Sequence, residues 1–160
     1  MKRPDLEKEK IMKIWILVIF RLSSVLERQI EALDKKIEKI ALNPFGVTEK
    51  QYAGIIELSD RRIRLLNMRA MYDVLIRSLS GEEIFLIAKY AFGLSAAEIA
   101  ELIGVKRGAA YKRIIKAVKR AEKLLADAGF DEERMQKEYL EFPAVGAALN
   151  ALKGKSRSDR

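Results

Sequence analysis

The 160-residue chain contains no cysteine and no histidine, and it has only 9 glycines and 3 prolines. The lack of cysteine rules out disulfide bonds and thiolate chemistry, and the joint lack of cysteine and histidine removes the usual zinc ligands. Histidine is also the side chain that most often serves as general base near neutral pH. We therefore expect neither an enzyme nor a metal or cofactor site.

Apolar residues make up 49% of the chain and charged residues of both signs 34%, a balance typical of a folded globular protein. The length fits one domain, or a small domain with an extension. Because glycine and proline are scarce, long loops are not expected, and the composition favours an all-α fold.

One apolar stretch, IMKIWILVIF at residues 11–20, resembles a membrane or targeting segment. Its uninterrupted part, Ile14–Phe20, is far shorter than the ~20 residues that a membrane-spanning helix needs. No small-residue cleavage site follows it. A buried helix segment is the favoured interpretation and an interfacial membrane helix the alternative, so we expect a cytoplasmic protein with no membrane partner.

The N-terminal part of the chain predicts a long helix from about Asp5 to Leu42. Its apolar residues recur at steps of three or four, with one irregular step after Leu26. This seam consists of Trp15, Ile19, Leu22, Leu26, Ile30, Leu33, Ile37 and Ile40. The turn sequence NPFG then ends the helix.

A second long helix is expected from Thr48, which has capping-box spacing to Gln51, to about Arg77. The short connection between the two helices predicts an antiparallel hairpin or coiled coil. The seam of the first helix either packs on the second helix or joins two copies of the chain as a dimer, and the two arrangements are compatible.

Shorter helices follow, each with its own start and stop signals. Two serine–glutamate pairs have capping-box spacing, Ser80–Glu83 and Ser95–Glu98, and two glycines stand at helix ends, Gly93 and Gly104. Further helices are expected at about 106–128, 131–142 and 143–152. The basic tail from Lys153 is expected to be disordered.

The positive charge of the chain is concentrated on the helix after Gly104. The whole chain has a net charge of +8, and nearly all of it lies between Gly104 and Leu125, where eight basic residues accompany a single acidic one, Glu122. A solvated helix face usually alternates glutamate with lysine, and this one does not. Such a focused positive stripe is typical of proteins that bind nucleic acid.

Residues 95–125 meet the main physical requirements of a helix-turn-helix unit. Ala100 is small enough for two helices to cross closely, and Gly104 allows a tight turn between them. The face opposite the apolar stripe of the second helix is the one that a recognition helix presents to the major groove of DNA. That face carries Arg107, Tyr111, Lys112, Lys116 and Lys119.

The segment from Ser78 to Leu125 resembles region four of bacterial alternative sigma factors. The resemblance rests on Leu79, Glu82, Glu83, Gly93-Leu94-Ser95, Glu98-Ile99-Ala100, Gly104, Arg113-Ile114 and Lys116-Ala117. In that family the start of the last helix reads the upstream promoter element. The resemblance therefore implies that five residues face DNA: Lys106, Arg107, Tyr111, Lys112 and Arg113.

Two departures from the family pattern matter. A run of small residues, Gly108 to Ala110, replaces the charged base-reading segment of primary sigma factors, so we expect modest sequence specificity. Arg107 and Lys112 are the best candidates for base edges, and the phosphate contacts are expected at Lys116, Lys119, Arg120 and Lys123. Residues 1–78 do not resemble region two, so the chain is not a complete sigma factor.

The overall plan resembles small phage or prophage transcriptional regulators of the RinA and ArpU type, which activate late or lysis genes. It divides the chain into an N-terminal hairpin at 1–78, a helix-turn-helix domain at 79–128 and a C-terminal extension at 129–160. We expect a DNA-binding transcription regulator whose partners are double-stranded DNA, RNA polymerase and a second copy of the chain. The alternatives are a ring-forming DNA-packaging subunit of the small terminase type, and a polymerase-binding protein with little sequence-specific DNA binding.

Overall fold

The computed structural model describes residues 14–158, and all regular elements in that range are helices, as the composition predicts. A helix at residues 14–22 comes first. The later elements are α2 (Leu26–Ala41), α3 (Glu49–Ser78), α4 (Gly81–Ala91), α5 (Ala96–Ile103), α6 (Arg107–Asp127), α7 (Glu132–Tyr139) and α8 (Pro143–Ser158). Within the described range, none of these helices is long and apolar enough to cross a membrane.

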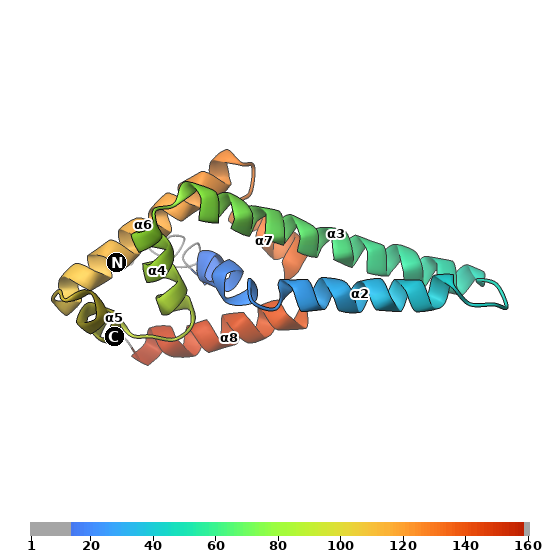
Figure 1. Cartoon of the computed structure of the whole chain (residues 1–160), viewed down its shortest axis with the longest axis horizontal. Helices are drawn as coiled ribbons and strands as arrows, with labels where there is room; N and C mark the ends of the chain where they lie inside the picture. Colours follow the sequence, from blue (N-terminus) through green and yellow to red (C-terminus); the bar gives the residue numbers. More distant parts are fainter. Residues whose placement is uncertain (1–13, 159–160) are drawn as a thin grey trace, which may run out of the picture.

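The helix at residues 14–22 lies at the centre of the molecule. Each residue from Trp15 to Phe20 is at most 6% exposed, so the helix is covered on all sides. In Figure 1 it lies among α3, α4, α6 and α8 (blue helix), and its side chains belong to one apolar cluster with residues of these helices. A helix that is apolar on every face is stable only when it is enclosed in this way. The interpretation of this stretch as a buried helix is confirmed for Trp15–Phe20.

The prediction of a single helix from Asp5 to Leu42 is wrong, because the chain turns at residues 23–25. The part of this prediction before residue 14 lies outside the described range. The Ser23 hydroxyl donates a 2.6 Å hydrogen bond to the carbonyl oxygen of Phe20. The Val25 N–H donates to the carbonyl of Leu22, only three residues back, at 2.9 Å. Serine hydroxyls compete for helix carbonyls and bend helices at serine pairs. The apolar seam therefore continues in the sequence but is divided between two helices.

Helices α2 and α3 pack side by side and project from the rest of the molecule as an arm (Figure 1). Their buried residues lie only at the inner end of the arm: Leu26 and Ile30 in α2, and Leu65, Met68, Met71 and Leu75 in α3. Ion pairs join the two helices at the surface, Arg62 with Asp34 and, at 2.7 Å, Arg69 with Glu27. The loop at the outer end is open to solvent, since Phe45 is 96% exposed.

The helix caps follow the sequence signals closely. The capping boxes Thr48–Gln51 and Ser80–Glu83 are confirmed, with side chain and backbone bonded in both directions. The third is only half formed: the Ser95 hydroxyl accepts from the Glu98 N–H, while the Glu98 carboxylate accepts from that hydroxyl and not from the backbone.

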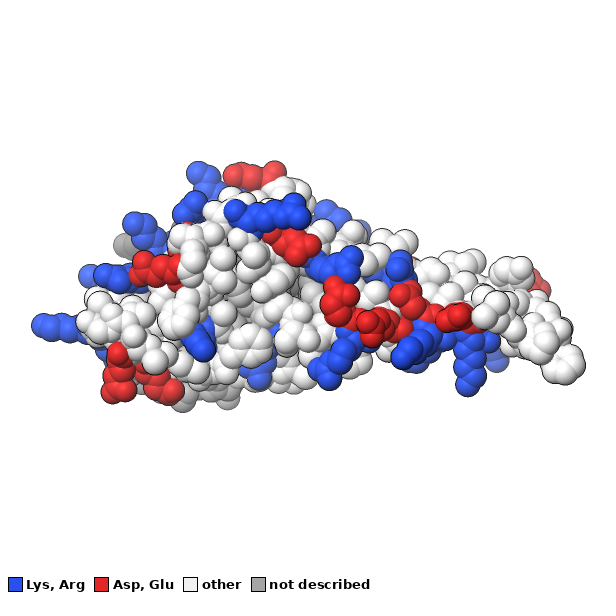
Figure 2. Space-filling model, in the orientation of Figure 1, with Lys and Arg blue, Asp and Glu red and all other residues white. Residues whose placement is uncertain are grey.

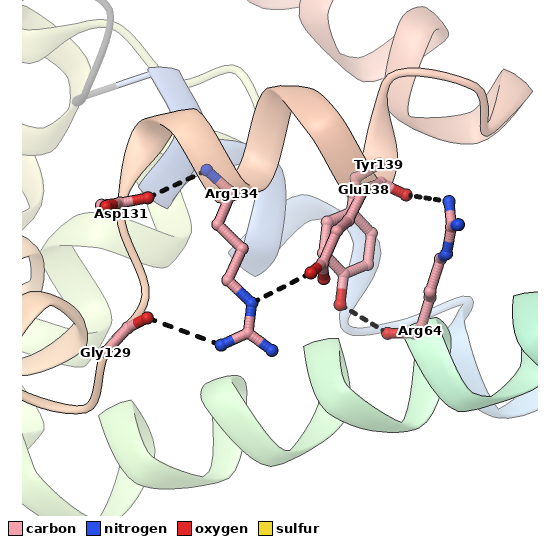
Figure 3. A network of polar contacts seen from close by, with 6 residues as sticks. All are labelled: Arg64, Gly129, Asp131, Arg134, Glu138 and Tyr139. Atoms are coloured by element: carbon pink, nitrogen blue, oxygen red, sulfur yellow. Dashed lines mark hydrogen bonds and ion pairs between the residues drawn. The ribbon is translucent and has the colours of Figure 1, made fainter.

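Helix α7 is fixed to α3 and to the end of α6 by polar contacts (Figure 3). Tyr139 and Arg64 link α7 to α3, and Arg134 Nη1 donates to the carbonyl oxygen of Gly129 at 3.5 Å. Asp131 caps α7, as expected, by accepting from the Arg134 N–H at 2.9 Å.

The C-terminal elements differ from expectation at two boundaries. Helix α7 ends at Tyr139, three residues before the expected end at Phe142. Helix α8 begins at Pro143, as predicted, but it continues to Ser158, so the tail expected to be disordered is helical as far as that residue. Within the described residues, the segments 1–78, 79–128 and 129–160 contribute to one shared apolar cluster.

Candidate nucleic-acid interface

Helices α5 and α6 are joined by a short turn and pack against each other. Gly104 ends α5 with a φ of +71°, a left-handed conformation in which a side chain would be strained. The Val105 N–H then donates to the carbonyl of Ala100 at 3.0 Å. Ala100 itself is 4% exposed, as a small residue at a close helix crossing should be.

One face of α6 is buried along the whole helix. Its buried residues are Ala110, Ile114, Ala117, Val118, Ala121 and Leu125, and they recur at helical spacing. Helices α3, α4 and α5 all contact α6. This packing fixes which face of α6 is turned outward.

The outward face carries four lysines, Lys112, Lys116, Lys119 and Lys123, which we call the lysine stripe. All four are at least partly exposed, and their steps of four, three and four residues place them on one side of the helix over about 16 Å. None of them takes part in an ion pair with another residue of the range 14–158. Basic side chains project along the outer edge of α6, at the left of Figure 2.

Two of the expected DNA-binding residues lie elsewhere on α6. Arg113 pairs with Glu82 at 3.1 Å, and Arg120 pairs with Glu83 at 2.6 Å, so both guanidinium groups are held against the start of α4. Arg120 also donates to the carbonyl oxygen of Ser78 at 3.3 Å. These arginines line a groove between α4 and α6, and in this structure their charge is balanced by the two glutamates.

The carboxylate of Glu83 is shared between a helix cap and an ion pair. Burial acts to raise its pKa, but hydrogen bonds from Ser80 and the charge and hydrogen bond of Arg120 outweigh burial, so the pKa of Glu83 lies below its ordinary value. The folded chain therefore favours the ionised form of Glu83, which pairs with Arg120.

The start of α6 brings the remaining candidates together. Lys106 is the N-cap residue of α6 and Arg107 its first residue, and both are exposed. Tyr111, which is 45% exposed, lies one turn further along. A shallow depression lies between the N-terminus of α5 and the start of α6. It is lined by Ala96, Arg107, Gly108 and Tyr111.

No protein-family model, curated protein or solved structure matches the chain. Within residues 14–158 no three acidic side chains are grouped so that they could hold a metal ion.

The structure divides the nine residues expected at DNA into three groups. Lys106, Arg107 and Tyr111 lie at the start of α6, and Arg113 and Arg120 lie against α4. Lys112, Lys116 and Lys119 form the outer stripe together with Lys123. Lys123, which the sequence indicated only as a phosphate contact, lies on the same face as Lys112, eleven residues earlier.

Proposed function

We propose that the chain is a DNA-binding transcription regulator in which α5 and α6 act as a helix-turn-helix unit. The start of α6 would enter the major groove, and the lysine stripe would lie along the phosphate backbone. The observation that carries the proposal is the separation of charge on α6. Its lysines lie on the outer face, while two arginines on its flank are neutralised by α4.

Sequence readout would come from few side chains. In the first two turns of α6, Arg107 and Tyr111 lie on the side next to α5 and Lys112 lies on the lysine stripe, while Gly108 and Ala109 offer no side chain long enough to reach a base. The resulting complex would derive most of its affinity from phosphates and only modest specificity from bases.

The test is a salt titration of DNA binding by fluorescence anisotropy on a random-sequence duplex. The Lys116→Ala/Lys119→Ala variant should bind more weakly than the wild type, and its log–log salt slope should be smaller by about 0.9 for every phosphate that it no longer neutralises. The matched control is Lys35→Ala/Lys36→Ala, which removes the same charge from exposed positions of α2. An equal weakening in the two variants would show only a general effect of net charge and would contradict the proposal.

Specificity requires a separate measurement, a selection of preferred duplexes from a random library. We expect the wild type to prefer the selected site over a scrambled one and Arg107→Ala to lose that preference while retaining general affinity. If no duplex binds below about 100 μM near physiological salt, DNA binding is rejected. The basic face of α6 would then be assigned to a protein partner, such as RNA polymerase.

A further inference from the structure

Helix α3 carries a second apolar stripe that the molecule itself does not cover. Tyr52 is 59% exposed, Ile56 69%, Ile63 55% and Val74 39%, and Ala70 is also exposed. Their steps of four, seven, seven and four residues keep all five within an arc of about 40° on the helix. We call these five residues the outer stripe of α3.

The outer stripe lies on the exposed side of α3, between the residues that contact α2 and α7. Leu65, on the core side, is two residues from Ile63 and therefore about 200° around the helix. Arg62, about 100° from Ile63, pairs with Asp34 of α2. An apolar stripe at heptad spacing on the solvated side of a helix is the pattern of a helix–helix contact.

We infer that the outer stripe joins two copies of this chain through an antiparallel α3–α3 contact centred on Ile63. The spacing of the five residues, four, seven, seven and four, is the same from either end of the helix. A second α3 that runs antiparallel therefore places Ile63 against Ile63. It also places Ile56 against Ala70 and Tyr52 against Val74, which pairs a larger side chain with a smaller one in both outer layers. A surface that matches its own copy in this manner is what a two-fold dimer requires.

The charges beside Ile63 are complementary under the same symmetry. Arg64 pairs with Asp60 at 2.9 Å within one chain and also donates to the carbonyl oxygen of Glu138, so both residues lie on the edge of the outer stripe next to α7. In the antiparallel contact, Asp60 of one copy lies about 3 Å along the helix axis from Arg64 of the other, so acidic and basic groups of both copies meet on that edge. On the opposite edge Arg62 is already neutralised by Asp34.

The size of the contact predicts a weak dimer. From Tyr52 to Val74 the stripe is about 33 Å long, and at a width of about 10 Å its footprint is about 330 Å² on each copy. A stable interface commonly covers about 800 Å² per partner. We therefore expect reversible association that increases with protein concentration, and the inference does not depend on DNA binding.

The lack of cysteine in the sequence allows a direct test in the full chain by mild oxidation of single-cysteine variants. Ile63→Cys should form a disulfide-linked dimer roughly ten times faster than Asn67→Cys, because a neighbouring thiol has a high effective concentration. Asn67 is an exposed residue one turn away, but its two copies would be about 12 Å apart along the axis, beyond disulfide reach. Equal rates for the two variants would overturn the inference.

A mixed experiment tests the register. Ile56→Cys and Ala70→Cys should crosslink with each other when mixed, whereas Ile56→Cys alone should not, because its two copies would be about 21 Å apart. Crosslinking of Ile56→Cys with itself would contradict the antiparallel arrangement. Sedimentation velocity provides the independent measurement: the wild type should sediment faster with rising concentration, and Ile63→Lys, folded by circular dichroism, should not. A wild type that stays monomeric throughout would also overturn the inference.

Discussion

Tyr139 and Arg64 bond to each other's helix in both directions. The Tyr139 hydroxyl donates to the carbonyl oxygen of Arg64 at 2.7 Å, and the Arg64 guanidinium donates to the carbonyl oxygen of Glu138 at 2.9 Å (Figure 3). The Tyr139 side chain is fully buried and makes edge contacts with Phe130 at a ring distance of 6.1 Å. The pair therefore connects α7 to the middle of α3 and makes the C-terminal extension part of the core.

Replacing Tyr139 with phenylalanine should lower the free energy of unfolding by about 1 kcal/mol, because the ring stays buried and only the hydrogen bond is removed. Urea unfolding at neutral pH measures this change. The matched control is Tyr111→Phe, which removes a hydroxyl from a tyrosine that is 45% exposed and should change stability little. An equally large decrease in the control would show that the buried hydrogen bond is not the cause.

The same tyrosine predicts a stability change at high pH. Burial, with a smaller contribution from the charge of Glu138, raises the pKa of Tyr139 from 10.0 to about 12. Because the folded chain favours the neutral phenol, this contribution to stability is complete below pH 10 and is lost as the pH rises through about 12. Unfolding measured across this range should show a steeper alkaline decline for the wild type than for Tyr139→Phe. If stability fell equally with pH in the wild type and in Tyr139→Phe, Tyr139 would not be the cause of the alkaline decline.

Most helices of the fold followed from local signals in the sequence. The way in which the arm packs on the core did not. Capping residues such as Thr48 and Ser80 act within one turn, so their spacing predicts helix starts reliably. The break at residues 23–25 was missed because the apolar seam continues across it at helical spacing. The hydroxyl of Ser23, bonded back to Phe20, and the Val25 N–H, bonded to Leu22, mark the turn, and the apolar spacing reveals neither.

The sequence predicts the helix that carries the candidate site, but it does not predict which basic side chains of that helix form ion pairs with α4. Periodicity places Lys112 and Lys116 opposite the buried face of α6, which the structure bears out through their exposure. The pairing of Arg113 and Arg120 with α4 joins residues more than thirty positions apart, and only the packing angle of α4 on α6 decides it. Sequence patterns carry no information on such angles.

A side chain at position 104 should destabilise the fold, whereas a side chain at position 108 should not. A Cβ at either position would meet no atom within 4 Å, so the difference lies only in the backbone. Gly104 has a φ of +71°, and Gly104→Ala should lower the free energy of unfolding by about 1–2 kcal/mol. Gly108 lies in the first turn of α6 with ordinary helical geometry, and Gly108→Ala should stabilise by about 0.4–1 kcal/mol. Thermal unfolding of the two variants compares them directly, and equal effects would refute the backbone argument.

Glu83 should contribute stability that disappears in acid. Since its pKa is below the ordinary value of 4.5, the ionised form stabilises the fold above that pH, and the contribution is lost as the pH falls through the lower, folded-state pKa. Glu83→Gln keeps an oxygen for the cap at Ser80 but removes the ion pair with Arg120. The variant should be less stable at neutral pH by about 0.5–1 kcal/mol, and the difference should shrink in acid. A difference independent of pH would contradict the ion-pair assignment.

Glu82 should restrain DNA binding by neutralising Arg113. If the lysine stripe contacts DNA, Glu82→Gln releases the Arg113 guanidinium beside it and removes a negative charge close to the proposed phosphate path. Affinity for a random duplex at low salt should rise several-fold, and the log–log salt slope should increase by up to about 0.9 if Arg113 then binds a phosphate. The matched control is Glu57→Gln, which also releases an arginine, Arg61, paired at 3.0 Å, but on the arm far from α6. A stronger effect of Glu82→Gln places DNA beside the α4–α6 groove, whereas equal effects would leave only the net charge of the protein as the cause.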